Sequence, residues 1–199
     1  MIQKLEEDSK LSPALSNLEA AGGGFVNASF KPCYWHKELK QILDLKTNYG
    51  TLSLGNKSPI NIEYVSANPT GPLHAGHGRV AVVADVLANL LVKVGYCVTR
   101  QYYVNDTGGQ IDLLARSTYL RYCEALNESI SEIPEGYYPG EYLKDVANAL
   151  ILQEKDKWLG QPEEASKGVF RDFSVKFLME KIRKDIKGLG ISQDVFPPN

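Results

Sequence analysis

The stretch Ser66-Ala67-Asn68-Pro69-Thr70-Gly71-Pro72-Leu73-His74-Ala75-Gly76-His77 decides the fold, because it separates two segments of different periodicity. Before it, residues 60–65 (INIEYV) alternate apolar and polar side chains, which is typical of a short strand. After it, residues 80–94 repeat apolar side chains every three or four positions, which predicts an amphipathic helix that ends near Gly95. A strand, a Gly/Pro-rich turn and a helix form half of a Rossmann-like unit, where a helix N-terminus favours anions such as phosphate.

Two histidines in this turn sharpen the prediction of a ligand site. His74 and His77 are three residues apart, so on the first turn of a helix they share a face. Gly76 leaves room for a nucleotide base or ribose against the backbone. Imidazoles donate hydrogen bonds to phosphate oxygens and stabilise charge that builds during nucleotidyl transfer. A helix cap with two incidental histidines is the plain alternative, and a metal site lacks a third ligand nearby.

Residues 63–111 (EYVSANPTGPLHAGHGRVAVVADVLANLLVKVGYCVTRQYYVNDTGGQI) resemble the catalytic core of bacterial arginyl-tRNA synthetases. HAGH stands in the place of the HIGH signature of class I aminoacyl-tRNA synthetases, which alone indicates only a superfamily of nucleotidyl transferases. The flanks SANPTGPL and YYVNDTGGQI narrow the resemblance to the arginine enzyme. It covers most of the chain, from about residue 23 onward. The fold class it implies is α/β, with a partial Rossmann-like parallel sheet and flanking helices.

The resemblance implies an arginine–tRNA ligase, which uses ATP to activate L-arginine as arginyl-adenylate and then transfers arginine to tRNA(Arg) in the cytoplasm. Mg²⁺ would arrive with ATP, and no metal held by the protein is expected. Family roles carried to matching positions assign catalysis to His74 and His77, and ATP binding to His74, Gly76 and His77. Glu63 and Asn68 would bind arginine.

Three more residues, Ser66, Asn105 and Gln110, are secondary candidates for lining the pocket. From the residues alone, Glu63 has two interpretations. A partly buried carboxylate at a strand end needs a cationic partner, which is either an internal salt bridge or a substrate guanidinium. A second strand is expected at residues 98–104, and Asp106 or Thr107 is placed to cap the helix that follows it. In that helix, one face is expected to carry Ile111, Leu114, Thr118 and Tyr122.

Composition describes an ordinary soluble globular protein, with 43% hydrophobic and 23% charged residues among 199. A net charge of −2 provides no global attraction to nucleic acid, so any tRNA contact requires a local patch. The three cysteines are widely spaced, as expected in a reducing compartment. No signal peptide or membrane-spanning run is apparent, so no membrane partner is expected.

Two domains are predicted, with the boundary in the polar connector at residues 48–59. Residues 1–55 resemble a remnant of the family's α+β N-terminal additional domain, which contacts tRNA. They are expected to contain a helical piece broken near Pro13, a strand at 25–30 and a short helix at 39–45. The helical piece is predicted from the spacing of Ile2, Leu5, Leu11, Leu15 and Leu18. Residues 56–199 would form the N-terminal part of the catalytic domain, with a helical insertion.

The last third is predicted to be helical, and its residues 167–187 carry a local charge excess of +4 (seven basic residues less three acidic). A solvated helix surface and a tRNA phosphate contact are both open interpretations. Residues 191–196 are expected to begin another strand.

The resemblance also implies that the chain is truncated at both ends, because no KMSKS-like run occurs in it. Two alternatives therefore stay open: an inactive or merely tRNA- or nucleotide-binding remnant, and a different HIGH-type nucleotidyl transferase. An incomplete sheet would expose a strand edge and an apolar face, which predicts self-association.

Overall fold

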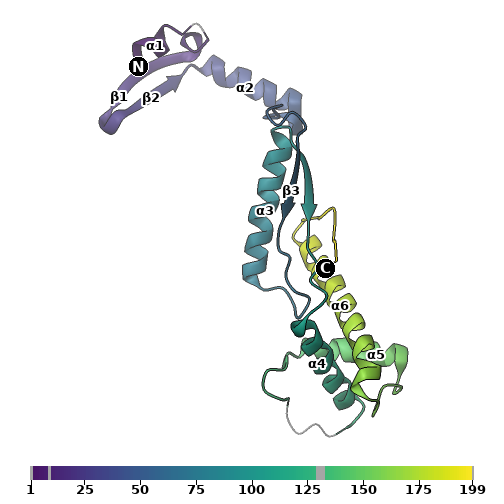
Figure 1. Cartoon of the computed structure of the whole chain (residues 1–199). Helices are drawn as coiled ribbons and strands as arrows, with labels where there is room; N and C mark the ends of the chain where they lie inside the picture. The colour runs from purple at the N-terminus through teal and green to yellow at the C-terminus, as the bar shows by residue number, and fades with distance from the viewer. Residues whose placement is uncertain (1, 9, 129–132, 199) are drawn as a thin grey trace. The chain divides into compact units, whose positions relative to one another are not determined.

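The computed structural model describes residues 2–8, 10–128 and 133–198 and contains two compact units, residues 1–51 and 52–199. The first unit comprises α1 (Ile2–Glu6), a hairpin of β1 (Leu15–Ala21) and β2 (Phe25–Phe30), and α2 (Pro32–Leu45) (Figure 1). The strands pair antiparallel, with Ala21 opposite Phe25. Gly23 and Gly24 make the turn at φ of 75° and 87°, a region that favours glycine.

The predicted helical piece around Pro13 is correct only for its start. Leu15 and Leu18 lie on β1 instead of a helix. The reason is tertiary: β2 pairs with this segment across the glycine turn, and Leu18 lies opposite Ala28. The predicted strand at 25–30 is confirmed, and the predicted helix at 39–45 is the C-terminal half of α2.

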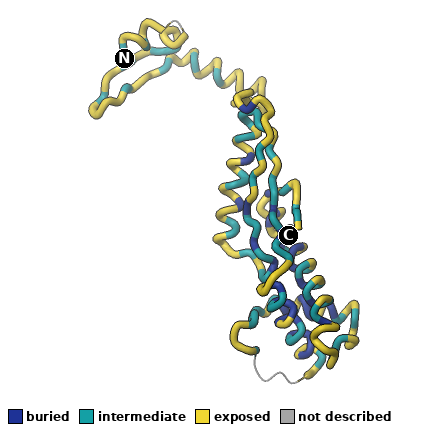
Figure 2. Tube along the Cα trace, in the orientation of Figure 1, coloured by how far each residue is buried: buried dark blue, intermediate teal, exposed yellow. Residues whose placement is uncertain are grey.

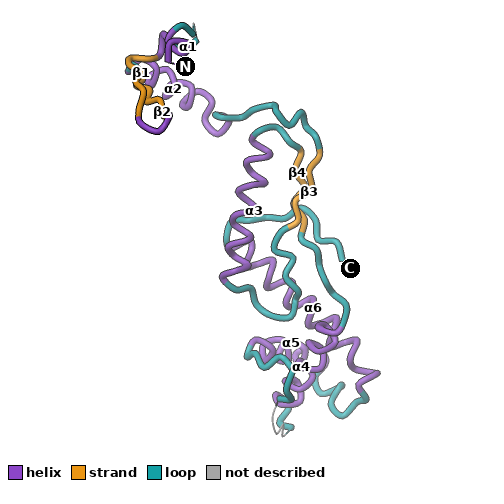
Figure 3. The backbone as a smooth tube through the Cα atoms, turned by 60° about the vertical axis from the view of Figure 1, so that its left-hand side comes forward, coloured by secondary structure: helices purple, strands orange, loops and turns teal. Residues whose placement is uncertain are grey.

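The second unit begins with the predicted β-α-β arrangement. β3 (Pro59–Glu63) leads to α3 (Ala75–Lys93), which leads to β4 (Cys97–Gln101) (Figure 3). The two strands are parallel, with Glu63 opposite Gln101. Gly95, at φ 97°, ends the helix as predicted. The chain at 191–198 adds only two isolated parallel bridges, Gln101 to Val195 and Val104 to Pro198, so the further strand predicted there forms in part.

Three helices complete this unit: α4 (Gly109–Ala125), α5 (Tyr142–Glu154) and α6 (Glu163–Gly188). α6 links two cores. Near its start, Phe170 packs with Tyr122 of α4 and Leu150 of α5. Near its end, Ile182 packs with Ala81 of α3 and the residues around β3 and β4. Buried residues are dense among α4, α5 and α6 (Figure 2). α6 therefore fixes the helical region against α3 and the sheet.

α3 buries one side and exposes apolar side chains on the other. Val83 is 64% exposed and Leu90 is 58% exposed. By length and composition, α3 would also pass as a membrane-spanning helix, a test that core helices of soluble proteins pass as well. The expectation that no run is long and apolar enough to span a membrane therefore does not hold for α3 on those criteria.

Candidate active site

The N-terminus of α3 is capped by the two histidines predicted to share a face. His74 is the N-cap residue, and its Nδ1 accepts a hydrogen bond of 3.1 Å from the backbone N–H of Gly76. The backbone N–H of His74 in turn donates to Nδ1 of His77 at 3.3 Å. The two rings stack, with centroids 3.8 Å apart and planes inclined by 20°. The plain interpretation as a helix cap is thus realised, and it brings both imidazoles to one place.

This arrangement determines what the imidazoles offer to a ligand. A neutral ring whose Nδ1 accepts a hydrogen bond carries its proton on Nε2. Burial and the neighbouring His74 lower the pKa of His77 from its ordinary value of 6.5. At neutral pH, His77 is therefore an uncharged ring with an Nε2–H donor. His74 is exposed and His77 is half-buried, so ligand atoms can reach both.

Gly76 lies close to the His74 ring. A Cβ added there would lie 2.9 Å from Cε1 of His74 and 3.0 Å from its Nδ1. Any larger residue would therefore require the His74 ring to shift. This constraint exists whether or not a nucleotide lies against Gly76.

The turn after β3 has an unusual backbone. Val65 and Ser66 have φ of 68° and 39°, which is costly for residues with a side chain and most costly for a β-branched one. The hydroxyl of Ser66 accepts a 3.0 Å hydrogen bond from the backbone N–H of Tyr103. The hydroxyl of Tyr102, a fully buried residue, donates to the carbonyl of Ala67 at 2.7 Å. Burial raises the pKa of Tyr102 to about 12, so this donor keeps its proton.

The structure brings together two of the residues predicted from sequence. Nδ2 of Asn68 donates a 2.6 Å hydrogen bond to Oε1 of Gln110, the second residue of α4. Asn105 is half-buried on the loop before α4 and makes no side-chain hydrogen bond within residues 2–8, 10–128 and 133–198.

Two expectations about neighbouring polar residues are wrong. Glu63 was expected to be partly buried, yet it is exposed, because it is the last residue of a strand whose alternate side chains face inward. It has no cationic partner in the part of the chain that the structure describes. The N-cap residue of α4 is Gly108, at φ 93°, instead of Asp106 or Thr107.

Sequence reasoning missed a polar cluster that fastens α3 to the strands. The carboxylate of Asp85 accepts hydrogen bonds from the hydroxyl of Tyr64 at 3.2 Å and from Nδ2 of Asn89 at 2.8 Å. Arg100 on β4 lies 3.6 Å from Asp85 and donates to Asn89 at 2.7 Å. Burial raises the pKa of Tyr64 to about 12, and the nearby carboxylate of Asp85 is the second cause of this rise. The spacing of four between Asp85 and Asn89 was the available signal, but it fits a solvated face equally well.

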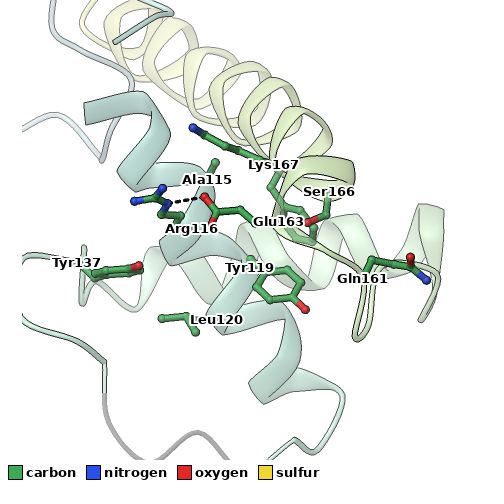
Figure 4. Close-up of a pocket in the computed structure, with 10 residues that line it drawn as sticks. Ala115, Arg116, Tyr119, Leu120, Tyr137, Gln161, Glu163, Ser166 and Lys167 are labelled. Atoms are coloured by element: carbon green, nitrogen blue, oxygen red, sulfur yellow. Dashed lines mark hydrogen bonds and ion pairs between the residues drawn. The ribbon is translucent and has the colours of Figure 1, made fainter. Parts of the chain in front are cut away.

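An open hollow of about 450 Å³ adjoins His74, between the start of α3 and the end of α6. Its lining consists of Leu73, His74, Gly78, Ala81, Lys184, Asp185, Gly188 and Leu189. A smaller and more closed cavity, of about 140 Å³, lies between α4 and α6 (Figure 4). There Nε of Arg116 pairs with Glu163 at 2.7 Å, and the side chains of Tyr119 and Leu120 also line the cavity. None of the residues predicted to act on substrate lines this second cavity.

Four of the seven basic residues at 167–187 contact partners within the fold. Lys167 pairs with Asp112 at 2.8 Å, and Lys181 lies 3.7 Å from Asp145. The guanidinium of Arg183 lies 4.2 Å from the centre of the Phe196 ring. These contacts favour a structural role for much of the local positive charge. Among the described residues, no group of three or more His, Cys, Asp and Glu side chains is placed to hold a metal ion.

Comparison with known proteins decides the family. Residues 38–154 match the family described as "tRNA synthetases class I (R), catalytic domain". The chain belongs to the class I arginyl-tRNA synthetase family. Its mixed α/β fold, with a parallel β3–β4 pair and flanking helices, is the fold of that catalytic domain.

Curated relatives include the arginine–tRNA ligase of Wolbachia pipientis wMel, which is 51% identical over 192 residues. That match covers 96% of this chain and 33% of the relative. The arginine–tRNA ligase of Bartonella bacilliformis is 48% identical over 187 residues, covering 94% of this chain and 32% of the relative. The chain thus spans about a third of the length of the curated relatives it matches.

Solved structures agree in fold. A structure assigned as an arginyl-tRNA synthetase from Campylobacter jejuni superimposes with a TM-score of 0.74 at 33% identity, over 83% of this chain and 36% of that one. The Thermus thermophilus arginyl-tRNA synthetase gives a TM-score of 0.55 at 18% identity, over 99% of this chain and 32% of that one, which supports the fold alone.

Proposed function

We propose that this chain carries the nucleotide-binding and part of the arginine-binding machinery of an arginine–tRNA ligase. That enzyme joins ATP and L-arginine into arginyl-adenylate and then transfers arginine to tRNA(Arg) during protein synthesis in the cytoplasm. The observation that carries the proposal is the stacked His74–His77 pair at the N-terminus of α3 in a member of this family. Its two Nε2–H groups are suited to phosphate oxygens.

In the proposed reaction, a carboxylate oxygen of arginine attacks the α-phosphorus of ATP. The new P–O bond forms as the bond to the pyrophosphate oxygen breaks. His74 and His77 donate hydrogen bonds to the phosphate oxygens on which charge builds, and no protein nucleophile takes part. Mg²⁺ enters on the ATP phosphates and neutralises their charge. Gly76 receives the adenosine against the backbone.

Arginine is proposed to lie at the end of β3. The exposed carboxylate of Glu63 pairs with no cation among the described residues, which suits a bidentate pair with a substrate guanidinium. Asn68 would orient the amino-acid end of the substrate, with Ser66, Asn105 and Gln110 around it. Of these, Ser66 is already engaged by the backbone of Tyr103, so its role is to shape the turn.

The deciding experiment is arginine-dependent ATP–pyrophosphate exchange on this 199-residue chain with tRNA(Arg) present. His77→Ala should abolish exchange, whereas His36→Ala, a matched change at an exposed histidine on α2, should not. Exchange that survives His77→Ala would contradict the assigned role. Absence of exchange in a folded wild-type chain would reject activity of this chain alone.

A binding role without catalysis is the second candidate. Such a chain would bind nucleotide or tRNA but release no pyrophosphate. Titration with tRNA(Arg) at several salt concentrations tests it, because phosphate contacts give a steep salt dependence. Family membership argues against a different HIGH-type nucleotidyl transferase acting on a small molecule.

A further inference from the structure

We propose that Tyr142, at the start of α5, is a positioning residue for the His74–His77 pair, because its hydroxyl holds the turn from which α3 begins. The inference rests on the proposed function for its effect on ATP binding. It assigns the helical region, formed by α4, α5 and α6, a part in the nucleotide site.

The turn that leads into α3 has its last hydrogen-bonded anchor at Thr70. The carbonyl of Thr70 accepts a 2.5 Å hydrogen bond from the hydroxyl of Tyr142. Residues 71–73 come next, and they form no hydrogen bond within the part of the chain that the structure describes. His74 then follows as the N-cap of α3. The position at which the helix starts therefore depends on where Tyr142 holds the turn.

The Tyr142 hydroxyl itself has a fixed position. Its ring packs against a buried cluster that includes Leu114 of α4, Val146 of α5 and Leu178 of α6. A Cβ added at Gly71 would lie 3.2 Å from Oη of Tyr142 and 3.3 Å from its Cζ, so the ring also lies against the turn. Burial raises the pKa of Tyr142, and the hydroxyl therefore remains a donor at neutral pH. A flip of the ring about its own axis leaves Oη in place, so the anchor cannot swing away.

The first turn of α3 is weak and needs such an anchor. Its second and fourth residues are Gly76 and Gly78, and each glycine weakens a helix by about 1 kcal/mol relative to alanine. The backbone N–H of Gly76 donates to Nδ1 of His74, and that of Gly78 donates to the carbonyl of His74, both at 3.1 Å. Both bonds, and the stacking of His74 on His77, require the His74 backbone to stay at the N-cap. Movement of the turn would therefore fray the start of the helix and separate the two rings.

The test measures two quantities by NMR for the whole chain and its variants: amide hydrogen exchange of the two glycines in the first turn of α3, and the dissociation constant of Mg·ATP. Tyr142→Phe removes only the hydroxyl that binds Thr70. The matched control is Tyr122→Phe, which removes a hydroxyl hydrogen bond of the same 2.5 Å length, to the carbonyl of Lys155, from the same helical region. A mere loss of stability would affect both variants alike, whereas a positioning role would affect Tyr142→Phe alone.

In Tyr142→Phe we expect the amides of Gly76 and Gly78 to exchange at least about fivefold faster, and ATP to bind at least about threefold more weakly. Tyr122→Phe should change each quantity less than about twofold. Glycine amides that exchange as slowly in Tyr142→Phe as in wild type would overturn this inference and leave the proposed function standing. Faster exchange with unchanged ATP affinity would overturn it too, because Tyr142 would then support only the fold. A folded wild type that binds no ATP would overturn the proposed nucleotide site, and the exchange rates would still decide whether Tyr142 holds the histidine pair.

A second variant tests the same contact from the side of the turn. Gly71→Ala should push against Oη of Tyr142 and speed the exchange of the same two amides. In the Tyr142→Phe chain, where Oη is absent, Gly71→Ala should add less than it adds in the wild type. Fully additive effects would contradict the inference, because Gly71 and Tyr142 would then act on the turn independently.

Discussion

His74 and His77 each accept a backbone N–H through Nδ1, and their rings stack with centroids 3.8 Å apart. The same atoms therefore cap α3 and fix the proton of each neutral ring on Nε2. In His77, Nδ1 therefore stabilises the helix cap, whereas Nε2–H is the group proposed to act in catalysis.

His77→Ala should lower the free energy of unfolding by about 1 kcal/mol, because the backbone N–H of His74 loses its acceptor. His77→Gln should recover most of this loss, since glutamine is a usual third-position partner in a capping box. Urea unfolding followed by circular dichroism measures both. Equal losses in the two variants would mean that the cap does not stabilise the helix.

His77 should titrate below the 6.5 that is ordinary for histidine, because burial and His74 disfavour its charged form. The unfolded chain then binds more protons near pH 6 than the folded chain does. The contribution of His77 to stability is therefore present above about pH 6.5 and is lost as the pH falls through the lower folded pKa. NMR titration of the ring in the folded chain and in urea measures the difference, and a folded pKa above the unfolded one would refute the expectation.

Asp85→Ala should destabilise the chain by about 2–3 kcal/mol, because it leaves Arg100, 17% exposed at its side chain, without its carboxylate and also removes the acceptor of the Tyr64 hydroxyl. Asp145→Ala is the matched control, since its ion pair with Lys181 is much more exposed, and it should cost less than about 1 kcal/mol. Chemical denaturation of both variants provides the comparison. Similar losses would show that the Asp85 cluster is no stronger than a surface pair.

Gly95→Ala and Gly78→Ala should change stability in opposite directions. Gly95 has φ 97°, and a Cβ there would lie 2.8 Å from the carbonyl oxygen of Leu52, so alanine should cost about 1–3 kcal/mol. Gly78 lies within α3 with nothing within 4 Å of an added Cβ, so alanine should add about 0.5–1 kcal/mol. Thermal unfolding of the pair tests this. A gain in stability from Gly95→Ala would show that the turn tolerates a side chain.

The chain should self-associate in solution, because α3 exposes apolar side chains and β3 pairs only with β4 among the described strands. Sedimentation velocity over a range of protein concentrations should show growth of a larger species. Replacing Val83 and Leu90 by lysine should reduce it, since these side chains are 64% and 58% exposed. A wild-type chain that remains monomeric over the whole range would contradict the prediction.

Periodicity sufficed to predict the β-α-β segment and the buried face of α4, because each of these depends on neighbours within a few residues. Ile111, Leu114, Thr118 and Tyr122 are all buried, as their spacing predicts. It failed at β1, where Leu15 and Leu18 fit a helix until β2 pairs with them. It also failed at Asp106 and Thr107, where the helix begins at a glycine instead.

The sequence by itself determined that His74 and His77 follow a strand and start a helix, and its motifs predicted the family, since HAGH, its flanks and the strand–turn–helix pattern are local and contiguous. Only the tertiary structure decided how the predicted residues meet. Asn68 and Gln110 are 42 positions apart, and their 2.6 Å bond exists because the chain returns through β4 to start α4 beside the turn after β3. Asp85 and Arg100 meet for a similar reason, across the crossover from α3 to β4. Short-range patterns specify elements, whereas contacts between polar groups depend on where those elements pack, which no single segment encodes.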